Sequence, residues 1–310
     1  MPPFCPLGVI IMRKIKSSAF LGSLLVILAA CLWGCTGLFV EGISAAGLGA
    51  MDIVVLRGFA AALVLVPIML AVDPKLFRVR LRDVWCFIGS GVLSMLFFNY
   101  CYYTNIQESG KTVAVVLLFT FPVFVVLLSR LFFKEKITGN KILAMVLILV
   151  GCALVSGIVG AGITLSTRGL LIGLASGFGY SLYTIFSRCA LNRHYSPITI
   201  TFYTFLLSAV GGVFLIDVPA VAQTALHAGM GLWGPLLAYV LIGTVGAYLM
   251  YTAGLRHVDT SKAAMLKAAE PASTAILQIA VQGIWPDTFA LVGVGIIVLA
   301  IVVLNWKKRK

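Results

Sequence analysis

Apolar residues dominate the chain in ten long runs that are separated by short polar segments. Each run is close to the roughly 20 residues that a helix needs to cross a bilayer. The runs cover about 19–40, 50–72, 84–103, 111–131, 140–158, 168–188, 197–217, 232–254, 258–282 and 287–305. This pattern predicts an all-α polytopic membrane protein with ten transmembrane helices.

Composition supports this prediction. Of the 310 residues, 61% are hydrophobic and 11% are charged, whereas soluble proteins carry about 25% charged residues. The seven cysteines show no CxxC pair, and six of them lie in or beside apolar runs. They are therefore interpreted as packing residues, and neither a metal site nor a cofactor is expected.

The net charge of +13 raises the possibility of a nucleic-acid partner, but the positions of the basic residues argue against one. Nineteen of the 23 Lys and Arg residues fall on one side of the ten-span topology, and only Lys111 and Arg168 fall on the other. Because cytoplasmic loops of membrane proteins carry an excess of Lys and Arg, both termini are predicted to be cytoplasmic.

An internal repeat is the next signal. A shift of 149 residues places Pro122 on Pro271 and Tyr102 on Tyr251, and the register continues without a gap to about residue 305. Each copy holds five spans, and an odd number makes the two repeats inverted in the membrane, which places a substrate site between them near the midplane.

The domain boundaries follow from this register. A cytoplasmic segment at 1–18 precedes the first five-helix repeat at 19–158, and the second repeat at 168–305 is followed by a basic tail at 306–310. Met12, which precedes the basic residues Arg-Lys-Ile-Lys, is an alternative start to Met1.

The stretch 262–282 carries the most unusual chemistry, because Lys267, Glu270 and Pro271 lie in the middle of a predicted span. A charge at the centre of a spanning helix costs roughly 3 kcal/mol, and such residues usually face a cavity or a partner. On an unbroken helix Lys267 and Glu270 share a face. They are expected either to form an ion pair that a substrate or proton opens, or to form a structural pair. Helix kinks are predicted at Pro122 and Pro271.

Two segments carry a family resemblance. Residues 104–138, with the Pro122 helix and Lys134-Glu135-Lys136, and residues 253–287, with Glu270-Pro271, resemble the ends of EamA-type modules of the drug/metabolite transporter superfamily. Trp33-Gly34 and Arg57 match the same pattern. The resemblance covers about 19–305 and implies a ten-helix inverted-repeat carrier of small metabolites, often an exporter of amino acids or related compounds.

The chain departs from the pattern in one place. The second module often carries a Gly-Glu pair after its proline helix, and here the sequence continues Gln-Gly-Ile-Trp-Pro-Asp at 282–287. Lys267 is not a hallmark of the family, so it is a candidate for determining the choice of substrate.

Candidate substrate-binding residues lie on polar stripes of the predicted helices: Lys267, Glu270, Asn99, Tyr180, Tyr248, Trp33 and Arg57. Glu270 is also the candidate for coupling to a proton. The cavity is expected between spans one, three, four, six, eight and nine, with Lys267 and Glu270 at its floor. Each of these residues has a structural alternative in interhelical hydrogen bonding and packing. Tyr102 and Tyr251 lie near span ends and are expected to form interhelical hydrogen bonds or to be interfacial aromatics.

These observations predict a secondary transporter in the bacterial cytoplasmic membrane that works by alternating access. Its partners are expected to be a small-molecule substrate and membrane lipid, with the chain a monomer or homodimer. A polytopic enzyme acting on lipid-linked substrates is the main alternative, and a channel or receptor is a third class. The sequence has no Walker A motif, so ATP is not expected to drive transport directly.

Overall fold

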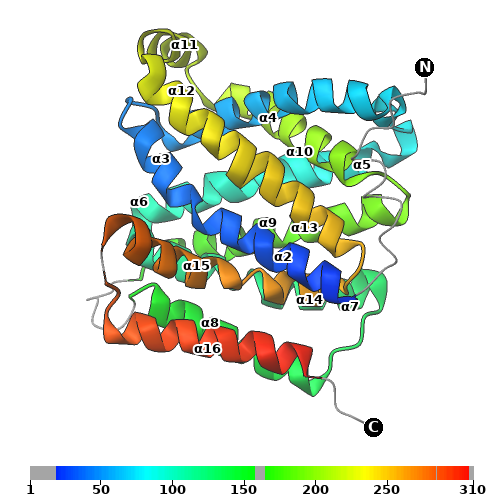
Figure 1. Cartoon of the computed structure of the whole chain (residues 1–310), viewed down its shortest axis with the longest axis vertical. Helices are drawn as coiled ribbons and strands as arrows, with labels where there is room; N and C mark the ends of the chain where they lie inside the picture. The colour runs from blue at the N-terminus through cyan, green and yellow to red at the C-terminus, as the bar shows by residue number, and fades with distance from the viewer. Residues whose placement is uncertain (1–18, 158–164, 284, 307–310) are drawn as a thin grey trace, which may run out of the picture.

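The computed structural model describes residues 19–157, 165–283 and 285–306. The choice between Met1 and Met12, and most of the basic tail, lie outside these residues. The described part is helical throughout, and Figure 1 shows most helices running side by side along one direction.

The first described helix of the first repeat is α2. In this half, η1 and η2 are short 3₁₀ turns and η3 is a π-helix. The bounds are α2 Ala19–Gly34, α3 Thr36–Ser44, α4 Ala50–Val72, η1 Pro74–Phe77, η2 Leu81–Asp83, α5 Val84–Ile88, η3 Gly89–Leu96, α6 Phe97–Leu118, α7 Phe121–Phe133 and α8 Gly139–Val155.

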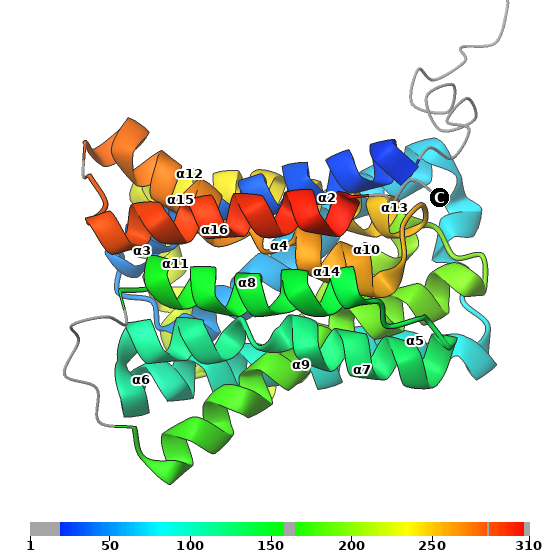
Figure 2. The same ribbon diagram turned by 90° about the horizontal axis from the view of Figure 1, so that it is seen from below.

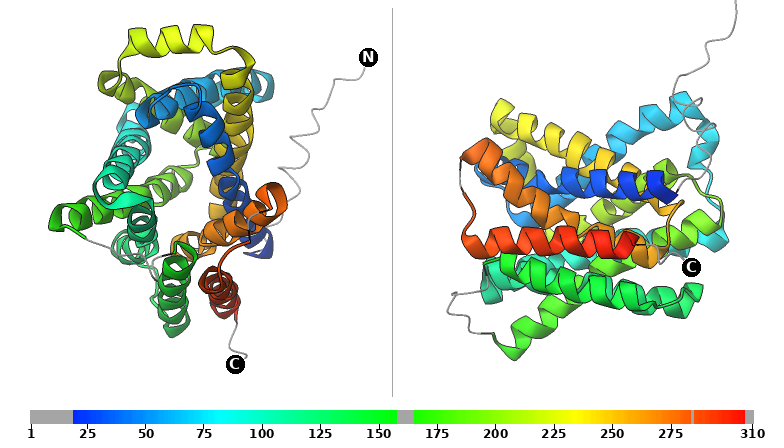
Figure 3. Two further views of the ribbon diagram at one scale, coloured as in Figure 1. Left: turned by 90° about the vertical axis from the view of Figure 1, so that its left-hand side faces the viewer. Right: turned by 60° about the horizontal axis from the view of Figure 1, so that its bottom comes forward.

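The second repeat follows the same order, with one additional short helix, α11. The bounds are α9 Thr167–Asn192, α10 Pro197–Gly212, η4 Val213–Leu215, α11 Val218–His227, α12 Gly229–Ala238, η5 Tyr239–Gly246, α13 Ala247–Leu255, α14 Thr260–Leu266, α15 Ala269–Leu277, η6 Gln278–Gln282 and α16 Thr288–Asn305. Figure 3 shows α11 lying across the end of the bundle while most other helices are seen end-on.

Seven helices in the described residues are long and apolar enough to cross a membrane by themselves. The other three spans are interrupted or short. Span four begins after Gly110, where φ of 81° breaks α6, and continues into α7. Span five is α8, with 17 residues, and span nine consists of α14, α15 and η6. The chain is thus an all-α polytopic membrane protein with ten spans, as the pattern predicted.

Both repeats contain the same irregularities at the same places. The π-helical segments η3 and η5 lie 150 residues apart in spans three and eight. Helix breaks also precede Pro122 in span four and Pro271 in span nine, and these two prolines lie 149 residues apart. Each break has one cause: proline has no amide hydrogen, so the carbonyl four residues earlier loses its helical partner.

Counterpart helices of the two repeats pack against each other. The pairs are α4 with α10 and α8 with α16, and spans four and nine meet where α7 packs against α14. In contrast, α2 packs against α13 and α6 against α9. In Figure 2, α8 and α16 lie side by side along their lengths, as they do in Figure 1.

The contact between α8 and α16 depends on two glycines. A Cβ at Gly151 would lie 2.9 Å from the carbonyl oxygen of Gly293, and a Cβ at Gly293 would lie 2.7 Å from the carbonyl oxygen of Gly151. Small residues allow helix backbones to approach closely in a bilayer, where packing rather than hydrophobic burial drives association.

The variant Gly151→Val tests this contact, because its side chain must push the two helices apart. We expect a loss of about 1–3 kcal/mol in the free energy of unfolding, measured by thermal unfolding in detergent. Gly295→Val is the matched control, since the space around Gly295 is open within 4 Å. Equal melting temperatures for the two variants would contradict the role of the glycine contact.

Candidate functional site

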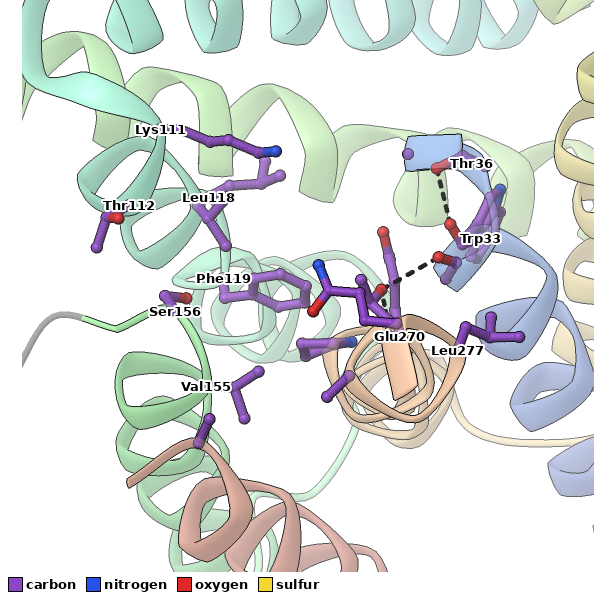
Figure 4. A pocket seen from close by; sticks show the side chains of 18 of the residues that line it. Trp33, Thr36, Lys111, Thr112, Leu118, Phe119, Val155, Ser156, Glu270 and Leu277 are labelled. Carbon is purple, nitrogen blue, oxygen red and sulfur yellow. Dashed lines mark hydrogen bonds between the residues drawn. The ribbon is translucent and has the colours of Figure 1, made fainter. Parts of the chain in front are cut away.

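A cavity of about 380 Å³ enters the bundle between the two repeats. This volume lies in the range of about 300–1,000 Å³ that is usual for small-molecule sites. Its walls combine aromatic, apolar and hydroxyl-bearing side chains with three charged ones, Glu41, Lys111 and Glu270. Figure 4 shows Trp33 and Glu270 on the wall of this space, with Phe119 and Lys111 also around it.

Six spans contribute to the cavity. Residues of α2 and α3, of both halves of α6, of the end of α8, of α15 and of the start of α16 line it. The expectation that spans six and eight line the cavity is therefore wrong for the described residues, and spans five and ten take their place. Tyr180 and Tyr248, on spans six and eight, lie behind the wall and are buried.

Glu270 is the charged group inside the cavity. It lies in the first turn of α15, where a helix N-terminus stabilises a negative charge. Its Oε2 accepts a hydrogen bond of 3.3 Å from the hydroxyl of Tyr180. Farther along span nine, Thr274 of α15 and Gln278 of η6 also line the cavity, so three polar side chains of this span face one space.

Lys267 is fully buried, with an exposed fraction of 0%, and does not line the cavity. Its Nζ lies over four aromatic rings, at 3.3 Å from the ring centroid of Tyr180, 4.3 Å from that of Trp33, 5.3 Å from that of Phe121 and 5.4 Å from that of Tyr251. Within the described residues, Nζ has no hydrogen-bond partner.

Lys267 and Glu270 do not form the direct ion pair that their spacing suggested. Among the described residues, no oxygen of Glu270 lies within the 4.0 Å of Lys267 Nζ that defines the four ion pairs of the structure. The reason is the helix break: Lys267 follows the last residue of α14, and Glu270 is the second residue of α15. Tyr180 links the two charges instead, with its ring against Lys267 and its hydroxyl on Glu270.

Trp33 contacts both the cavity and the buried Lys267. It lines the cavity and its ring faces Lys267 Nζ, while the edge of its ring system meets Tyr248 at a centroid distance of 4.9 Å. Its indole nitrogen is buried and has no partner in the described part of the chain.

The remaining candidates lie away from the cavity. Asn99 donates to the carbonyl of Met95 at 2.6 Å, and the hydroxyl of Tyr248 points to the sulfur of Met95 at 3.4 Å. Arg57 hydrogen-bonds the hydroxyl of Tyr239 and lies over the rings of Phe205 and Tyr239. These contacts hold α4, α10 and η5 together.

Two aromatic residues around Lys267 were not among the candidates, Phe121 and Tyr251. Tyr251 makes the interhelical hydrogen bond that was one expectation for it, since its hydroxyl pairs with that of Thr184 of α9 at 2.7 Å. It is fully buried rather than interfacial, because α13 packs along α2 in the bundle interior. The alignment of the two repeats could have identified Tyr251 as a residue near the site, since it places Tyr251 at the position of Tyr102, which lines the cavity. The described residues hold no group of His, Cys, Asp and Glu arranged to bind a metal ion.

At the opposite end of the same helices, a cluster of four residues joins the two repeats by hydrogen bonds and ion pairs. We call it the Glu135 latch (Glu135, Lys141, Thr260 and Ser261). Glu135 accepts hydrogen bonds from the backbone N–H groups of Thr260 at 2.7 Å and Ser261 at 3.1 Å, and from the Ser261 hydroxyl at 2.5 Å. It thereby caps α14, whose first N–H groups have no partner within the helix.

Lys141 completes the latch. Its Nζ donates to the hydroxyl of Ser261 at 2.6 Å and lies 3.7 Å from Glu135 and 3.5 Å from Asp259. The latch joins the α7–α8 connection of the first repeat to the start of α14 in the second. The cavity is therefore open at one end of the bundle while the repeats are fastened together at the other.

Ten spans in two repeats, with a polar cavity between them, define a multi-pass membrane transporter. The family model described as the EamA-like transporter family matches residues 20–157 and 167–306. The chain belongs to this family, and the resemblance carried by Pro122, Pro271 and their neighbours is confirmed.

Known proteins agree with this assignment. The chain is similar to the uncharacterized transporter YwfM of Bacillus subtilis (25% identity, covering 93% of this chain and 95% of the relative). It is also similar to the uncharacterized inner membrane transporter YicL of Salmonella typhimurium (24%, covering 93% and 96%) and to an uncharacterized transporter of Archaeoglobus fulgidus (25%, covering 93% and 97%). One crystal structure shares the fold with a TM-score of 0.74 at 17% identity, covering 92% of this chain and 96% of the other.

The latch yields a prediction about pH, because Glu135 lies outside the spans. Burial raises the pKa of Glu135, but hydrogen bonds from Ser261 and Thr260 outweigh it and lower the pKa below its ordinary value of 4.5. A depressed pKa means that the latch contributes fully above pH 4.5 and is lost as the pH falls through the lowered value. Glu135→Gln should lower the free energy of unfolding by about 1–3 kcal/mol at pH 7.

The measurement is thermal unfolding of both proteins across pH. The difference between wild type and Glu135→Gln should shrink below pH 4.5. Glu108→Gln is the control. Glu108 accepts a hydrogen bond from the hydroxyl of Ser166 and pairs with the exposed Arg168, and exposed ion pairs contribute about 0–1 kcal/mol to stability. A difference for Glu135→Gln that does not change with pH would argue against the latch.

Proposed function

We propose that the chain is a secondary carrier of small amino compounds, amino acids or close relatives, which it exports across the bacterial cytoplasmic membrane by alternating access. The observation that carries the proposal is the position of Glu270, which lines the cavity and is only partly exposed, whereas Lys267 is buried and does not line it. A carboxylate in a partly aromatic wall attracts a substrate ammonium group.

The charges at the mouth support a zwitterion. Glu41 and Lys111 are exposed side chains of the cavity lining, so a compound whose amino group binds Glu270 can present its carboxylate towards Lys111. Trp33 and Tyr102 supply apolar surface for the rest of the substrate. Because Lys267 does not line the cavity, its charge is not proposed to bind an anionic substrate, and a substrate with an amino group is proposed instead.

Glu270 is also proposed to couple transport to a proton. An ionised carboxylate is costly in the membrane interior unless it is paired, so Glu270 would hold either the substrate ammonium or a proton while the cavity changes sides. Exchange of one for the other lets a proton gradient drive the substrate in the opposite direction.

Alternating access is supported by the two repeats and by the latch. Inverted repeats can rock about a site between them, and the Glu135 latch lies where the second opening would form. Its three hydrogen bonds to Glu135 would break in that state. Export is proposed from the family resemblance, and the bias of Lys and Arg supports cytoplasmic termini.

The polytopic enzyme remains the less favoured class. It would need polar groups clustered at one interface, whereas Glu270, Thr274 and Gln278 follow one another along the depth of the cavity. The relatives YwfM and YicL are named as transporters. The substrate and membrane lipid are the proposed partners, with the chain a monomer or homodimer.

Glu270→Gln tests the proposal. In purified protein, amino acids and primary amines should raise the melting temperature of wild type, because a ligand that binds only the folded state stabilises it. Organic acids without an amino group should not. The Glu270→Gln variant should bind at least tenfold more weakly, since loss of a charged hydrogen-bond partner costs about 1.5–3 kcal/mol.

Two control variants sharpen this test. Glu41→Gln alters an exposed acid at the mouth and should leave the affinity for amines nearly unchanged. Lys111→Gln should weaken the binding of amino acids more than that of amines, because only the amino acids carry the carboxylate. The proposal fails if organic acids stabilise the protein and Glu270→Gln still binds normally.

The orientation can be tested in whole cells with single cysteines in a background without other cysteines. A cysteine at Gln223, exposed in α11, should react with a membrane-impermeant maleimide. A cysteine at Lys75, exposed in η1 on the opposite side of the bundle, should react only after the cells are permeabilised. The reverse labelling pattern would place the termini outside.

A further inference from the structure

The environment of Lys267 is unusual for a lysine. Its Nζ is enclosed by Trp33, Phe121, Tyr180 and Tyr251, which we call the aromatic cage, and the whole side chain is inaccessible to solvent. No hydrogen-bond acceptor reaches Nζ within the described residues. The nearest ring is that of Tyr180, at 3.3 Å from its centroid.

This environment fits a different kind of cation better. A lysine ammonium has N–H groups that call for acceptors, and a buried donor without one costs free energy. A quaternary ammonium has no N–H group, and its attraction to aromatic faces requires no hydrogen bond. The aromatic cage therefore has the chemistry of a site for quaternary ammonium, and Lys267 occupies it from within the chain.

The aromatic cage borders the substrate cavity. Trp33 belongs to the cage and lines the cavity, and Tyr180 connects the cage to Glu270 through its hydroxyl. An acid that faces the cavity thus stands next to ring faces that attract positive charge. With the cage empty, the two together would bind an organic cation that enters from the cavity.

The helix break itself does not require a lysine. The repeat register aligns Lys267 with Leu118 and Glu270 with Phe121. Leu118 ends α6 immediately before the break that precedes Pro122, and it is 8% exposed. The first repeat thus forms a helix break with an apolar side chain at this position. The charge of Lys267 is therefore not needed to form the break and has another role.

We propose that Lys267 determines specificity: its tethered ammonium fills the aromatic cage and excludes quaternary ammonium compounds, which would otherwise bind the cage beside the substrate site. Removal of the side chain turns the site into one that binds quaternary ammonium compounds. The inference rests on the proposed function in one respect, namely that the cavity bounded by Glu270 is the substrate site.

The test uses tetramethylammonium, which is close in size to the side chain it replaces. The purified full-length chain in detergent is titrated with tetramethylammonium chloride, with sodium chloride at equal ionic strength as the reference, and the melting temperature is followed. Lys267→Ala should show a saturable rise of a few degrees over the reference, because binding to the folded state stabilises it. Wild type should show none.

Lys267→Met is the matched control. Methionine fills the cage without a charge, so this variant should also fail to bind, which separates occupation of the cage from repulsion by the lysine charge. The double variant Lys267→Ala/Glu270→Gln should bind at least tenfold more weakly than Lys267→Ala. If Lys267→Ala proves too unstable to purify, Lys267→Val, which keeps bulk at the helix break and frees the rings, replaces it.

Three results overturn the inference: equal stabilisation of wild type, binding by Lys267→Met as strong as by the smaller variants, or no binding by either Lys267→Ala or Lys267→Val. These results are distinct from failure of the proposed function. If wild type binds amino compounds through Glu270 but the small variants ignore tetramethylammonium, only this inference fails. If the small variants bind it but wild type binds no amino compound, only the proposed function fails.

Discussion

The missing amide hydrogen of Pro271 is the constraint from which the site follows. In a bilayer a backbone carbonyl has no water to bond, so the carbonyl of Lys267 accepts instead from the N–H of Glu270 at 3.0 Å. This tight turn separates α14 from α15. It places Lys267 after the end of one short helix and Glu270 in the first turn of the next, so that one charge is directed into the aromatic cage and the other into the cavity.

Both repeats contain a helix break before a proline, but the side chains at the two breaks differ. At the first break, Leu118 and Phe121 occupy the positions of Lys267 and Glu270, and both are apolar. Phe121 contributes a ring to the environment of Lys267, so one repeat supplies part of the cage and the other supplies the ion. Two similar repeats thereby produce one asymmetric site.

The ends of the bundle differ as well. At one end Glu135 and Lys141 fasten the first repeat to the start of α14, and at the other end the cavity opens between the repeats. Both arrangements use short helices whose terminal N–H groups lack partners within the helix. Polar groups at helix ends are costly when left without partners, so the hydrogen bonds of Glu135 stabilise the start of α14.

Much of this protein is determined by the sequence alone. Apolar runs of bilayer length, the basic loops and the register of 149 residues led to the ten spans, the two repeats and the family, since these depend on local composition and spacing. Glu270, Trp33 and Tyr180 could be singled out because polar and aromatic residues are rare in mid-span. Only the tertiary structure decided that Lys267 faces four rings rather than Glu270, that Tyr251 is buried and that Arg57 lies away from the cavity. Those facts depend on where the helix breaks and which helices pack together, and neither is encoded in the spacing along one helix.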